Sequence, residues 1–141
     1  MASSPPREII TNSAPAPVGP YSQAILAGEW LFCSGQIPLD PKNGTLVGEG
    51  DIQAETQQVL KNLLAVLKEA GFSTTQVVRT TIYLIDLMDF DKVNAIYAQV
   101  FGNGVSPARA CVQVAALPKG ARVEIDCIAW LGQIKSTAKI L

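Results

Sequence analysis

The segment Asp51-Ile-Gln-Ala-Glu-Thr-Gln-Gln-Val-Leu-Lys-Asn-Leu-Leu-Ala-Val-Leu-Lys-Glu-Ala-Gly71 decides the fold, because it carries the strongest helical pattern in the chain. Its apolar side chains recur three and four residues apart, as on one face of an α-helix. They are Ile52, Val59, Leu60, Leu63, Leu64, Val66, Leu67 and Ala70. Asp51 suits an N-cap and Gly71 suits a stop, while Lys61, Lys68 and Glu69 lie away from the stripe. We therefore predict a long helix with one face on a core.

Short segments with strand character lie on both sides of this helix. They cover residues 7–11, 21–27, 30–34, 77–85, 108–115 and 122–131. Residues 77–85 are rich in β-branched side chains, and residues 30–34 are aromatic and apolar enough to be a buried strand. A second helix is predicted from its N-cap Asp89 to Gly102. The order β-β-β-α-β-α-β-β predicts an α+β fold in which two helices cover one face of a mixed sheet.

The length of 141 residues is typical of one domain. We expect a flexible tail over residues 1–6, one domain over residues 7–131 and a C-terminal extension over residues 132–141. Hydrophobic residues make up 48% of the chain and the mean hydropathy is +0.24, more apolar than a domain of this size hides alone. No stretch reaches the roughly 18 apolar residues of a membrane span. The excess therefore predicts burial between subunits.

The inventory of side chains excludes several kinds of chemistry. Eleven Lys and Arg against twelve Asp and Glu give a net charge of −1 and a pI near 5.3, with no basic run, which argues against a nucleic-acid binder. Histidine is absent, which excludes a Ser-His-Asp or Cys-His nucleophile and removes the commonest metal ligand. Proton transfer must therefore rest on carboxylates, tyrosine, thiol, arginine or backbone groups.

Three cysteines, Cys33, Cys111 and Cys127, show no C-x-x-C spacing. An odd number without that spacing argues against a disulfide framework or a zinc site and favours a reducing compartment. The first residues lack the apolar core of a secretory signal. We expect a soluble cytoplasmic protein, with an organelle leader on a longer precursor as the open alternative.

Arg109 is the first candidate for function. In the segment 108–114, alternation places Arg109, Cys111 and Gln113 on one face of a strand. A buried guanidinium needs a partner, because burying an unpaired charge is costly. Two partners are open at this point: a carboxylate of the protein, in a structural ion pair, which the spacing alone favours, or a carboxylate of a ligand.

Glu124 is the second candidate. Arg122, Glu124 and Asp126 alternate on one face of the last predicted strand. Folding the last two strands about the turn at 117–120 brings Glu124 opposite Cys111 or Gln113, near Arg109 and on the same side of the sheet. Such an Arg and Glu could hold an anionic substrate and orient a water molecule, or they could simply pair with each other.

Weaker signals mark five further positions. Tyr21 follows an irregular segment and either points into a cleft or packs. Ser34 and Gly35 end a strand, where glycine permits close approach of a ligand or forms a bulge. Asn94 lies in the middle of the second helix and needs a hydrogen-bond partner if buried. Cys111 is a small core residue, and without histidine we do not expect it to act as a nucleophile.

Five motifs in order along the chain resemble the reactive intermediate deaminase (RidA/YjgF) family over about residues 7–131. They are Ala16-Pro-Val-Gly-Pro-Tyr-Ser-Gln-Ala24, Ser34-Gly-Gln-Ile-Pro38, Val93-Asn-Ala-Ile-Tyr97, Pro107-Ala-Arg-Ala-Cys-Val-Gln-Val-Ala-Ala-Leu-Pro-Lys-Gly120 and Val123-Glu-Ile-Asp126. The resemblance implies the chorismate-mutase-like fold and a homotrimer with a cleft between each pair of neighbouring subunits.

The resemblance also implies roles for the candidate residues. Arg109 would bind the carboxylate of the substrate through two parallel hydrogen bonds. Glu124 would act on a water molecule that attacks the imine carbon, and Cys111 would contribute mainly its backbone N–H. The cleft would be lined by Tyr21, Ser34, Gly35 and Asn94.

The implied activity is hydrolysis of 2-imino acids or enamines, such as 2-iminobutanoate and 2-iminopropanoate, to 2-keto acids and ammonia. Because imines hydrolyse spontaneously, this reaction requires no metal and no cofactor. The expected ligand is a 2-imino acid or a 2-keto acid. Two rivals stay open: an endoribonuclease that inhibits translation, against which the acidic pI and the missing histidine weigh, and a non-catalytic, chaperone-like binding trimer.

Overall fold

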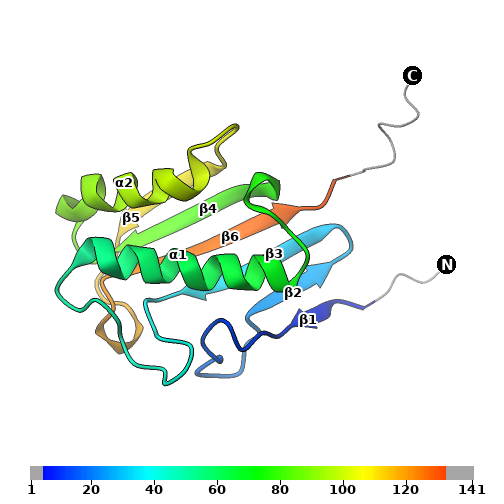
Figure 1. The fold of residues 1–141 in the computed structure, drawn as a ribbon, viewed down its shortest axis with the longest axis horizontal. Helices are drawn as coiled ribbons and strands as arrows, with labels where there is room; N and C mark the ends of the chain where they lie inside the picture. The colour runs from blue at the N-terminus through cyan, green and yellow to red at the C-terminus, as the bar shows by residue number, and fades with distance from the viewer. Residues whose placement is uncertain (1–4, 133–141) are drawn as a thin grey trace.

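Within residues 5–132, which this computed structural model describes, a six-stranded sheet lies beneath two helices (Figure 1). The strands are β1 (Arg7–Ile9), β2 (Ala24–Ala27), β3 (Trp30–Gln36), β4 (Val77–Leu84), β5 (Ala108–Gln113) and β6 (Val123–Trp130). The helices are α1 (Ile52–Glu69) and α2 (Phe90–Phe101), with 3-10 turns at η1 (Thr74–Gln76), η2 (Leu87–Asp89) and η3 (Pro118–Gly120). The predicted order of strands and helices is confirmed. Most of the two expected tails lies outside the described residues.

The strands run in the order β1-β2-β3-β6-β4-β5 across the sheet. Only β4 and β5 pair in parallel, because α2 carries the chain back over the sheet between them. The last strand, β6, then inserts antiparallel between β3 and β4. The prediction that the last two strands pair about the turn at 117–120 is therefore wrong. The crossover helix places β5 at the edge of the sheet, and β4 separates it from β6.

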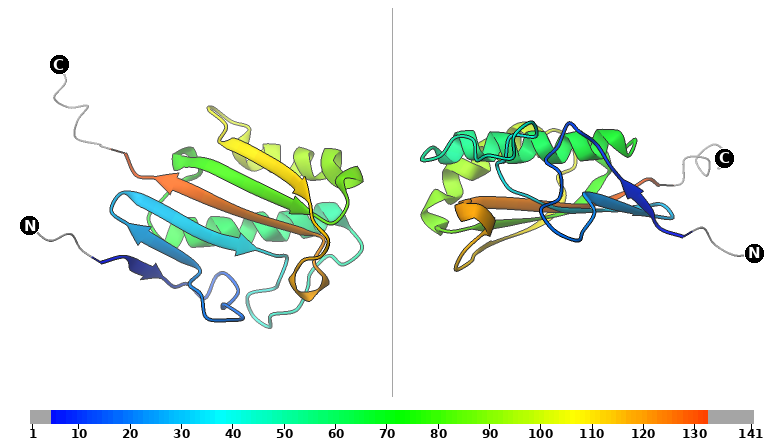
Figure 2. Two further views of the ribbon diagram at one scale, coloured as in Figure 1. Left: turned by 180° about the vertical axis from the view of Figure 1, so that it is seen from behind. Right: turned by 90° about the horizontal axis from the view of Figure 1, so that it is seen from below.

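The two faces of the sheet differ, as predicted. Both helices pack on one face, and no described helix covers the other (Figure 2). On that open face Trp30 and Phe32 expose 43% and 46% of their surface, and the Trp30 ring lies 6.0 Å from that of Trp130. The predicted burial of residues 30–34 therefore holds for one face only, which carries Leu31 and Cys33. The open face keeps the apolar excess that the composition indicated.

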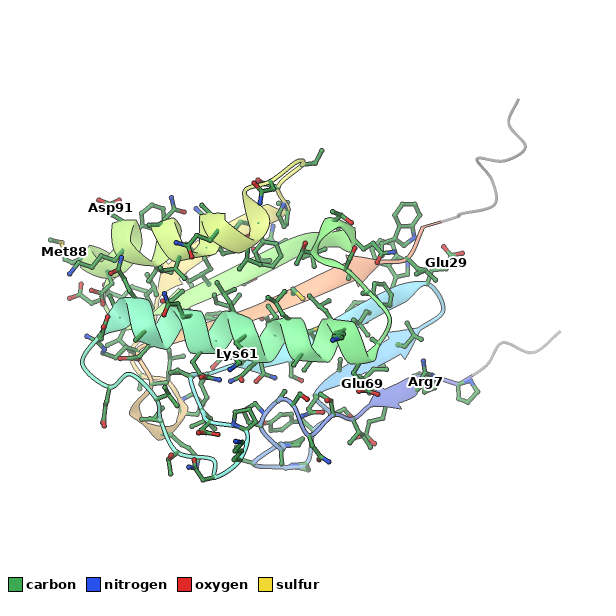
Figure 3. All side chains as sticks on the ribbon, in the orientation of Figure 1. Arg7, Glu29, Lys61, Glu69, Met88 and Asp91 are labelled. Atoms are coloured by element: carbon green, nitrogen blue, oxygen red, sulfur yellow. The ribbon has the colours of Figure 1, made fainter. Side chains whose placement is uncertain are left out.

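Helix α1 forms where its apolar stripe predicted it. The Asp51 side chain accepts hydrogen bonds from the N–H groups of Gln53 and Ala54, donors that a helix start leaves unpaired. The chain leaves the helix through Gly71, whose φ of +82° is costly for other residues. Lys61 and Glu69 are exposed on α1 (Figure 3), as expected for residues away from the apolar stripe. Neither helix of the described chain has the length and apolar character of a membrane span.

The start of α2 differs in detail from the prediction. Asp89 occupies the N-cap position, but its side chain accepts no hydrogen bond from the helix. Its backbone is already helical, at φ −83° and ψ −2°, because the turn η2 leads directly into the helix. The carboxylate that caps this region is Asp86, which accepts a hydrogen bond from the N–H of Met88. The predicted end of the helix at Gly102 is confirmed.

Candidate functional site

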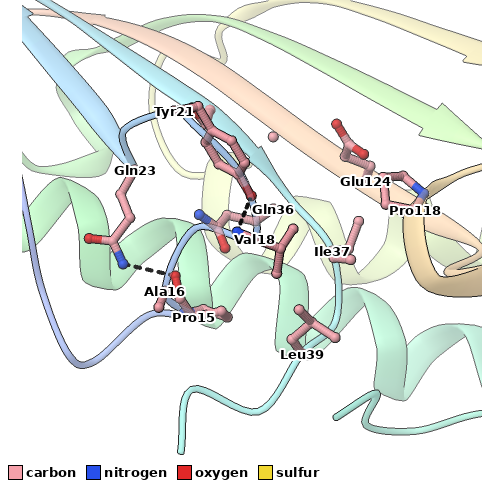
Figure 4. A pocket seen from close by; sticks show the side chains of 12 residues that line it. Pro15, Ala16, Val18, Tyr21, Gln23, Gln36, Ile37, Leu39, Pro118 and Glu124 are labelled. Atoms are coloured by element: carbon pink, nitrogen blue, oxygen red, sulfur yellow. Dashed lines mark hydrogen bonds between the residues drawn. The ribbon is translucent and has the colours of Figure 1, made fainter. Parts of the chain in front are cut away.

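A cavity of about 330 Å³ lies at the end of β3, between the loop before β2 and the strand β6 (Figure 4). Its walls are mainly apolar, with a few polar groups. The lining residues are Pro15, Ala16, Val18, Tyr21, Gln23, Ser34, Gly35, Gln36, Ile37, Leu39, Pro118 and Glu124. We call it the Glu124 cavity, because Glu124 is the only one of these lining residues that carries a carboxylate or an amino group.

The Glu124 carboxylate is half-buried on the open face of β6. Burial raises its pKa above the ordinary value, and the negative charge of Asp126 raises it further. Asp126 is held in place by the Tyr83 hydroxyl, which donates to its Oδ2 at 3.1 Å. A carboxylate with a raised pKa is a stronger base when ionised, so Glu124 suits proton transfer to and from a water molecule.

Gly35 lies directly beneath the Glu124 side chain. A Cβ atom added at residue 35 would come within 2.7 Å of the Glu124 Cδ and 2.9 Å of its Cγ. Such contacts are far closer than van der Waals separation. The absence of a side chain at Gly35 therefore creates the space in which the carboxylate sits. The structure supports the bulge interpretation, because the register of β3 against β6 shifts between Cys33 and Gln36, and the group that approaches Gly35 closely is the Glu124 side chain.

Tyr21 and Ser34 complete the polar lining of this cavity. Tyr21 lies on the side opposite Glu124 (Figure 4), with 48% of its surface exposed, and its hydroxyl accepts a hydrogen bond from the Val18 N–H at 3.2 Å. The Ser34 hydroxyl donates to the Ser22 carbonyl at 2.6 Å. Ser34 therefore holds the loop, whereas the Tyr21 hydroxyl still faces the cavity with its own hydrogen.

Two buried amides, which sequence reasoning missed, hold the walls of the Glu124 cavity. The Gln23 amide donates to the carbonyls of Ala14 and Pro15 and fixes the irregular loop before β2. Asn62 of α1 donates to the carbonyls of Ile37 and Leu39 at 3.2 and 2.9 Å. Both amides are almost fully buried. Their presence within otherwise apolar segments was the available signal, because a buried amide needs partners.

A second cavity, of about 320 Å³, lies at the edge strand β5 beneath α2. Its lining residues are Asn94, Tyr97, Ala98, Phe101, Gly102, Ser106, Pro107 and Arg109. We call it the Arg109 cavity. The Arg109 guanidinium is half-buried and donates from Nη1 to the Oδ1 atom of Asn94 at 2.7 Å. Asn94 thus has the partner that its position in the helix required.

No carboxylate of residues 5–132 forms an ion pair with Arg109. The ion pair found in this part of the chain joins Arg122 to the buried Glu55, at 2.9 Å from Nε to Oε2. The alternative of a structural ion pair for Arg109 is therefore not what the structure contains. A half-buried guanidinium with a neutral partner and an adjacent cavity keeps its full positive charge for a ligand.

Cys111 lies on the same face of β5 as Arg109 and packs against the core. Burial raises the pKa of its thiol, and the nearby Arg109 only partly opposes this effect. The thiol thus stays protonated near neutral pH and is a poor nucleophile. Cys33 and Cys127 are buried opposite each other in the core.

Arg109 and Glu124 do not meet within one chain. Arg109 pairs in register with Thr80 of β4, and Thr80 with Cys127 of β6, whose side chain faces the helices. Glu124 is three residues from Cys127 and points to the open face. Standard strand spacings put the Cα atoms of Arg109 and Glu124 about 14 Å apart. The predictions that Glu124 lies opposite Cys111 or Gln113, and on the same side of the sheet as Arg109, are both wrong.

The candidate residues therefore form two groups in the single chain. Tyr21, Ser34, Gly35 and Glu124 line one cavity, and Asn94 and Arg109 line the other. Cys111 lines neither. The interposed strand β4 sets the spacing, and the register of β5 and β6 along it sets the face, neither of which alternation within each strand could reveal.

Comparisons with known proteins agree with this architecture. The family described as endoribonuclease L-PSP matches residues 11–131. A RutC family protein of Synechocystis is 56% identical over 123 residues, covering 87% of this chain and 95% of the relative. The human protein named 2-iminobutanoate/2-iminopropanoate deaminase is 48% identical over 132 residues, covering 94% and 95% of the two chains.

A solved structure shows the same fold. The crystal structure of a putative endoribonuclease from Thermotoga maritima superposes with a TM-score of 0.86 at 43% identity, and the match covers 90% of this chain and 98% of that one. The motifs, the sheet order and these matches extend over nearly the whole described chain. The protein therefore belongs to the RidA/YjgF family, whose fold is chorismate-mutase-like and whose family model carries the description endoribonuclease L-PSP.

Proposed function

We propose that this protein hydrolyses 2-imino acids and their enamine tautomers, among them 2-iminobutanoate and 2-iminopropanoate, to 2-keto acids and ammonia. The observation that carries the proposal is the Arg109 guanidinium, which is half-buried, oriented by a neutral amide and free of any carboxylate of residues 5–132. The name of the human relative supports the same reaction.

The guanidinium suits a carboxylate ligand for geometric reasons. Arginine presents five N–H donors in a rigid fork, and Asn94 occupies one of them. The donors that remain match the two oxygens of a carboxylate, and a charge-assisted pair of this kind is both strong and directional. Binding the carboxylate fixes the adjacent C2 carbon of the substrate relative to the protein, which is a proximity effect.

We further propose that a homotrimer completes the site, with the Arg109 cavity of one subunit facing the Glu124 cavity of its neighbour. The open face of the sheet, with its exposed tryptophans and Phe32, supports burial against another copy. A cyclic trimer repeats one contact three times, so one such junction yields three equal sites.

In this arrangement Glu124 takes a proton from a water molecule as the water oxygen forms a bond to C2. The π electrons of the C=N bond move to nitrogen, which receives that proton from the Glu124 carboxyl group. The resulting carbinolamine then collapses: the Glu124 carboxylate accepts the hydroxyl proton and delivers it to the amino nitrogen, the C=O bond forms, and the C–N bond breaks with its electrons going to nitrogen, which leaves as ammonia. General acid–base help of this kind contributes about 10²–10⁴-fold, and the raised pKa of Glu124 makes the carboxylate a better base.

The variant Arg109→Ala tests the proposal. We expect at least a hundredfold loss in kcat/KM for freshly generated 2-iminobutanoate, measured as release of 2-oxobutanoate, because the substrate loses its anchor. Arg7→Ala is the matched control, since Arg7 is exposed on the distant edge strand β1. Retained activity in Arg109→Ala would show that the anchor is misassigned.

The wild type and Arg109→Ala also distinguish the proposed hydrolysis from the two rival functions. Cleavage of RNA by the wild type that disappears in Arg109→Ala, without any imino-acid hydrolysis, would favour the endoribonuclease. Suppression of the aggregation of a denatured client protein that survives in Arg109→Ala would favour the chaperone-like trimer, because an apolar surface and not the cavity would then do the binding.

A further inference from the structure

Helix α2 presents one line of side chains to Arg109. Phe90, Asn94 and Tyr97 are spaced four and three residues apart, so they share one face of the helix. The Arg109 Cζ lies 4.9 Å from the centre of the Tyr97 ring and 5.6 Å from that of Phe90. Both distances are within the range of a cation–π contact. The guanidinium is thus bracketed by two aromatic rings and one amide.

The Tyr97 ring is itself held in place by Thr80 of β4. Its hydroxyl shares a hydrogen bond of 2.7 Å with the Thr80 hydroxyl, and both residues are buried. Burial raises the pKa of the Tyr97 hydroxyl, so it stays neutral. Thr80 is also the residue of β4 that pairs in register with Arg109. The ring that contacts the guanidinium is therefore tied to the strand beside the one that carries Arg109.

Every group in this surround is uncharged. An amide oxygen and two aromatic faces stabilise a cation without neutralising it, whereas a carboxylate would neutralise it and compete with an anionic ligand. A long arginine side chain also loses rotamer freedom when a ligand fixes it. A surround that fixes the side chain in advance removes part of that loss at the moment of binding.

We propose that Tyr97 and Phe90 are positioning residues, which hold the Arg109 guanidinium ready for an anionic ligand through their ring faces, with Thr80 locking Tyr97. Neither residue is assigned contact with the ligand. The effect on substrate rests on the proposed function, but the order of the Arg109 side chain does not, so the two ideas can fail separately.

The first measurement needs no ligand. The chain contains four arginines, at positions 7, 79, 109 and 122, so protein labelled with ¹⁵N-arginine gives few Nε–Hε signals to assign. Arg122 is a rigid reference because of its ion pair with Glu55, and the exposed Arg7 is a mobile one. We expect the order parameter of Arg109 to be near that of Arg122 in the wild type, and to fall below about 0.6 in Tyr97→Leu.

Three variants separate the ring from the packing around it. Tyr97→Phe keeps the ring and loses only the bond to Thr80, so it should restore most of the order that Tyr97→Leu loses. Phe90→Leu should have a smaller effect than Tyr97→Leu, since its ring is farther away. Phe72→Leu is the control: it removes a buried aromatic side chain elsewhere in the core, and it should lower thermal stability without changing the order of Arg109.

The second measurement uses the reaction. Because Arg109 holds the carboxylate equally before and during the chemical step, Tyr97→Leu should raise KM about tenfold and change kcat little, with partial rescue in Tyr97→Phe. Equal order parameters for Arg109 in the wild type, Tyr97→Leu and Phe72→Leu would overturn the positioning role. A wild type that keeps Arg109 ordered but hydrolyses no imino acid would leave that role standing and refute the proposed function.

Discussion

The Arg109 cavity and the Glu124 cavity have nearly the same volume, about 320 and 330 Å³, but they differ in charge, in surroundings and in the face of the sheet that they use. The first holds a cation among neutral groups, on the helix side at the sheet edge. The second holds a carboxylate that burial and Asp126 make more basic, on the open side.

Separation in the chain preserves both properties. On one face and in contact, Arg109 and Glu124 would form an ion pair, which would lower the pKa of the glutamate and occupy the donors of the guanidinium. Placed on opposite faces, each keeps the charge state that its proposed task needs. In the proposed trimer, a ligand between neighbouring subunits would meet both groups while they remain apart in each chain.

The strongest test of this division mixes two variants, one that keeps only Arg109 intact and one that keeps only Glu124 intact. Arg109→Ala and Glu124→Gln homotrimers should each lose at least a hundredfold in kcat/KM. Refolding an equal mixture should restore about a quarter of wild-type activity, since each site of the proposed trimer draws one residue from each of two neighbours and half of the chains carry either intact residue. The assay is 2-keto acid release after size-exclusion chromatography. No recovery would mean that one chain supplies both groups.

Replacing the Asn94 amide by a carboxylate tests whether Arg109 must have uncharged neighbours to bind the substrate. Asn94→Asp keeps the shape of the side chain but puts a carboxylate oxygen where the amide oxygen accepts from Nη1 at 2.7 Å. The new ion pair should compete with the ligand, raising KM about fiftyfold, while the melting temperature stays the same or rises. Steady-state kinetics and calorimetry check the two effects.

The matched control for this change is Gln57→Glu, which makes the same change of charge at an exposed position of α1, away from Arg109 and outside both cavities. It should leave KM within about twofold of the wild type, because exposed charges at that distance are screened by salt. A normal KM in Asn94→Asp would mean that the charge of Arg109 is not what binds the substrate.

The sequence predicts which face of a helix or strand is buried better than it predicts which strands pair. The spacing of Val59, Leu63 and Val66 fixes the buried face of α1, because side-chain direction follows helical period. Alternation likewise places Arg109 and Cys111 on one face of β5. These features depend on a few neighbouring residues, so the sequence contains them directly.

The order of the strands depends on packing between distant segments. Nothing in the alternation of β5 or β6 states that β4 lies between them, which moves Glu124 away from Arg109, or that Arg109 and Cys127 share the register of Thr80, which puts Glu124 on the other face. The role of Gly35 was equally hidden, because the group that needs its missing side chain comes from a strand 89 positions later in the chain. The motifs that resemble the family identified these residues, but the sequence did not show how the residues are distributed between the two cavities.

The smallest expected effect concerns the tuning of Glu124. Glu124 must be ionised to accept a proton, so kcat/KM should fall as the pH drops through its pKa. Burial and Asp126 both raise that pKa, and the groups that face the carboxylate across the cavity and along β4 are Tyr21 and Tyr83. Asp126→Asn removes the like charge and lowers the pKa of Glu124, which moves the acid limb of the profile to lower pH.

Above that limb the variant should keep activity within about threefold of the wild type, slightly lower because a weaker base removes the proton less well. On the limb the order reverses and Asp126→Asn is the faster enzyme. Comparing both proteins on the same substrate cancels any titration of the imine itself, and Glu69→Gln, an exposed change at the end of α1, controls for net charge. An acid limb that stays in place, or moves to higher pH, would mean that Glu124 is not the group whose ionisation limits the reaction, even if Arg109 anchors the substrate.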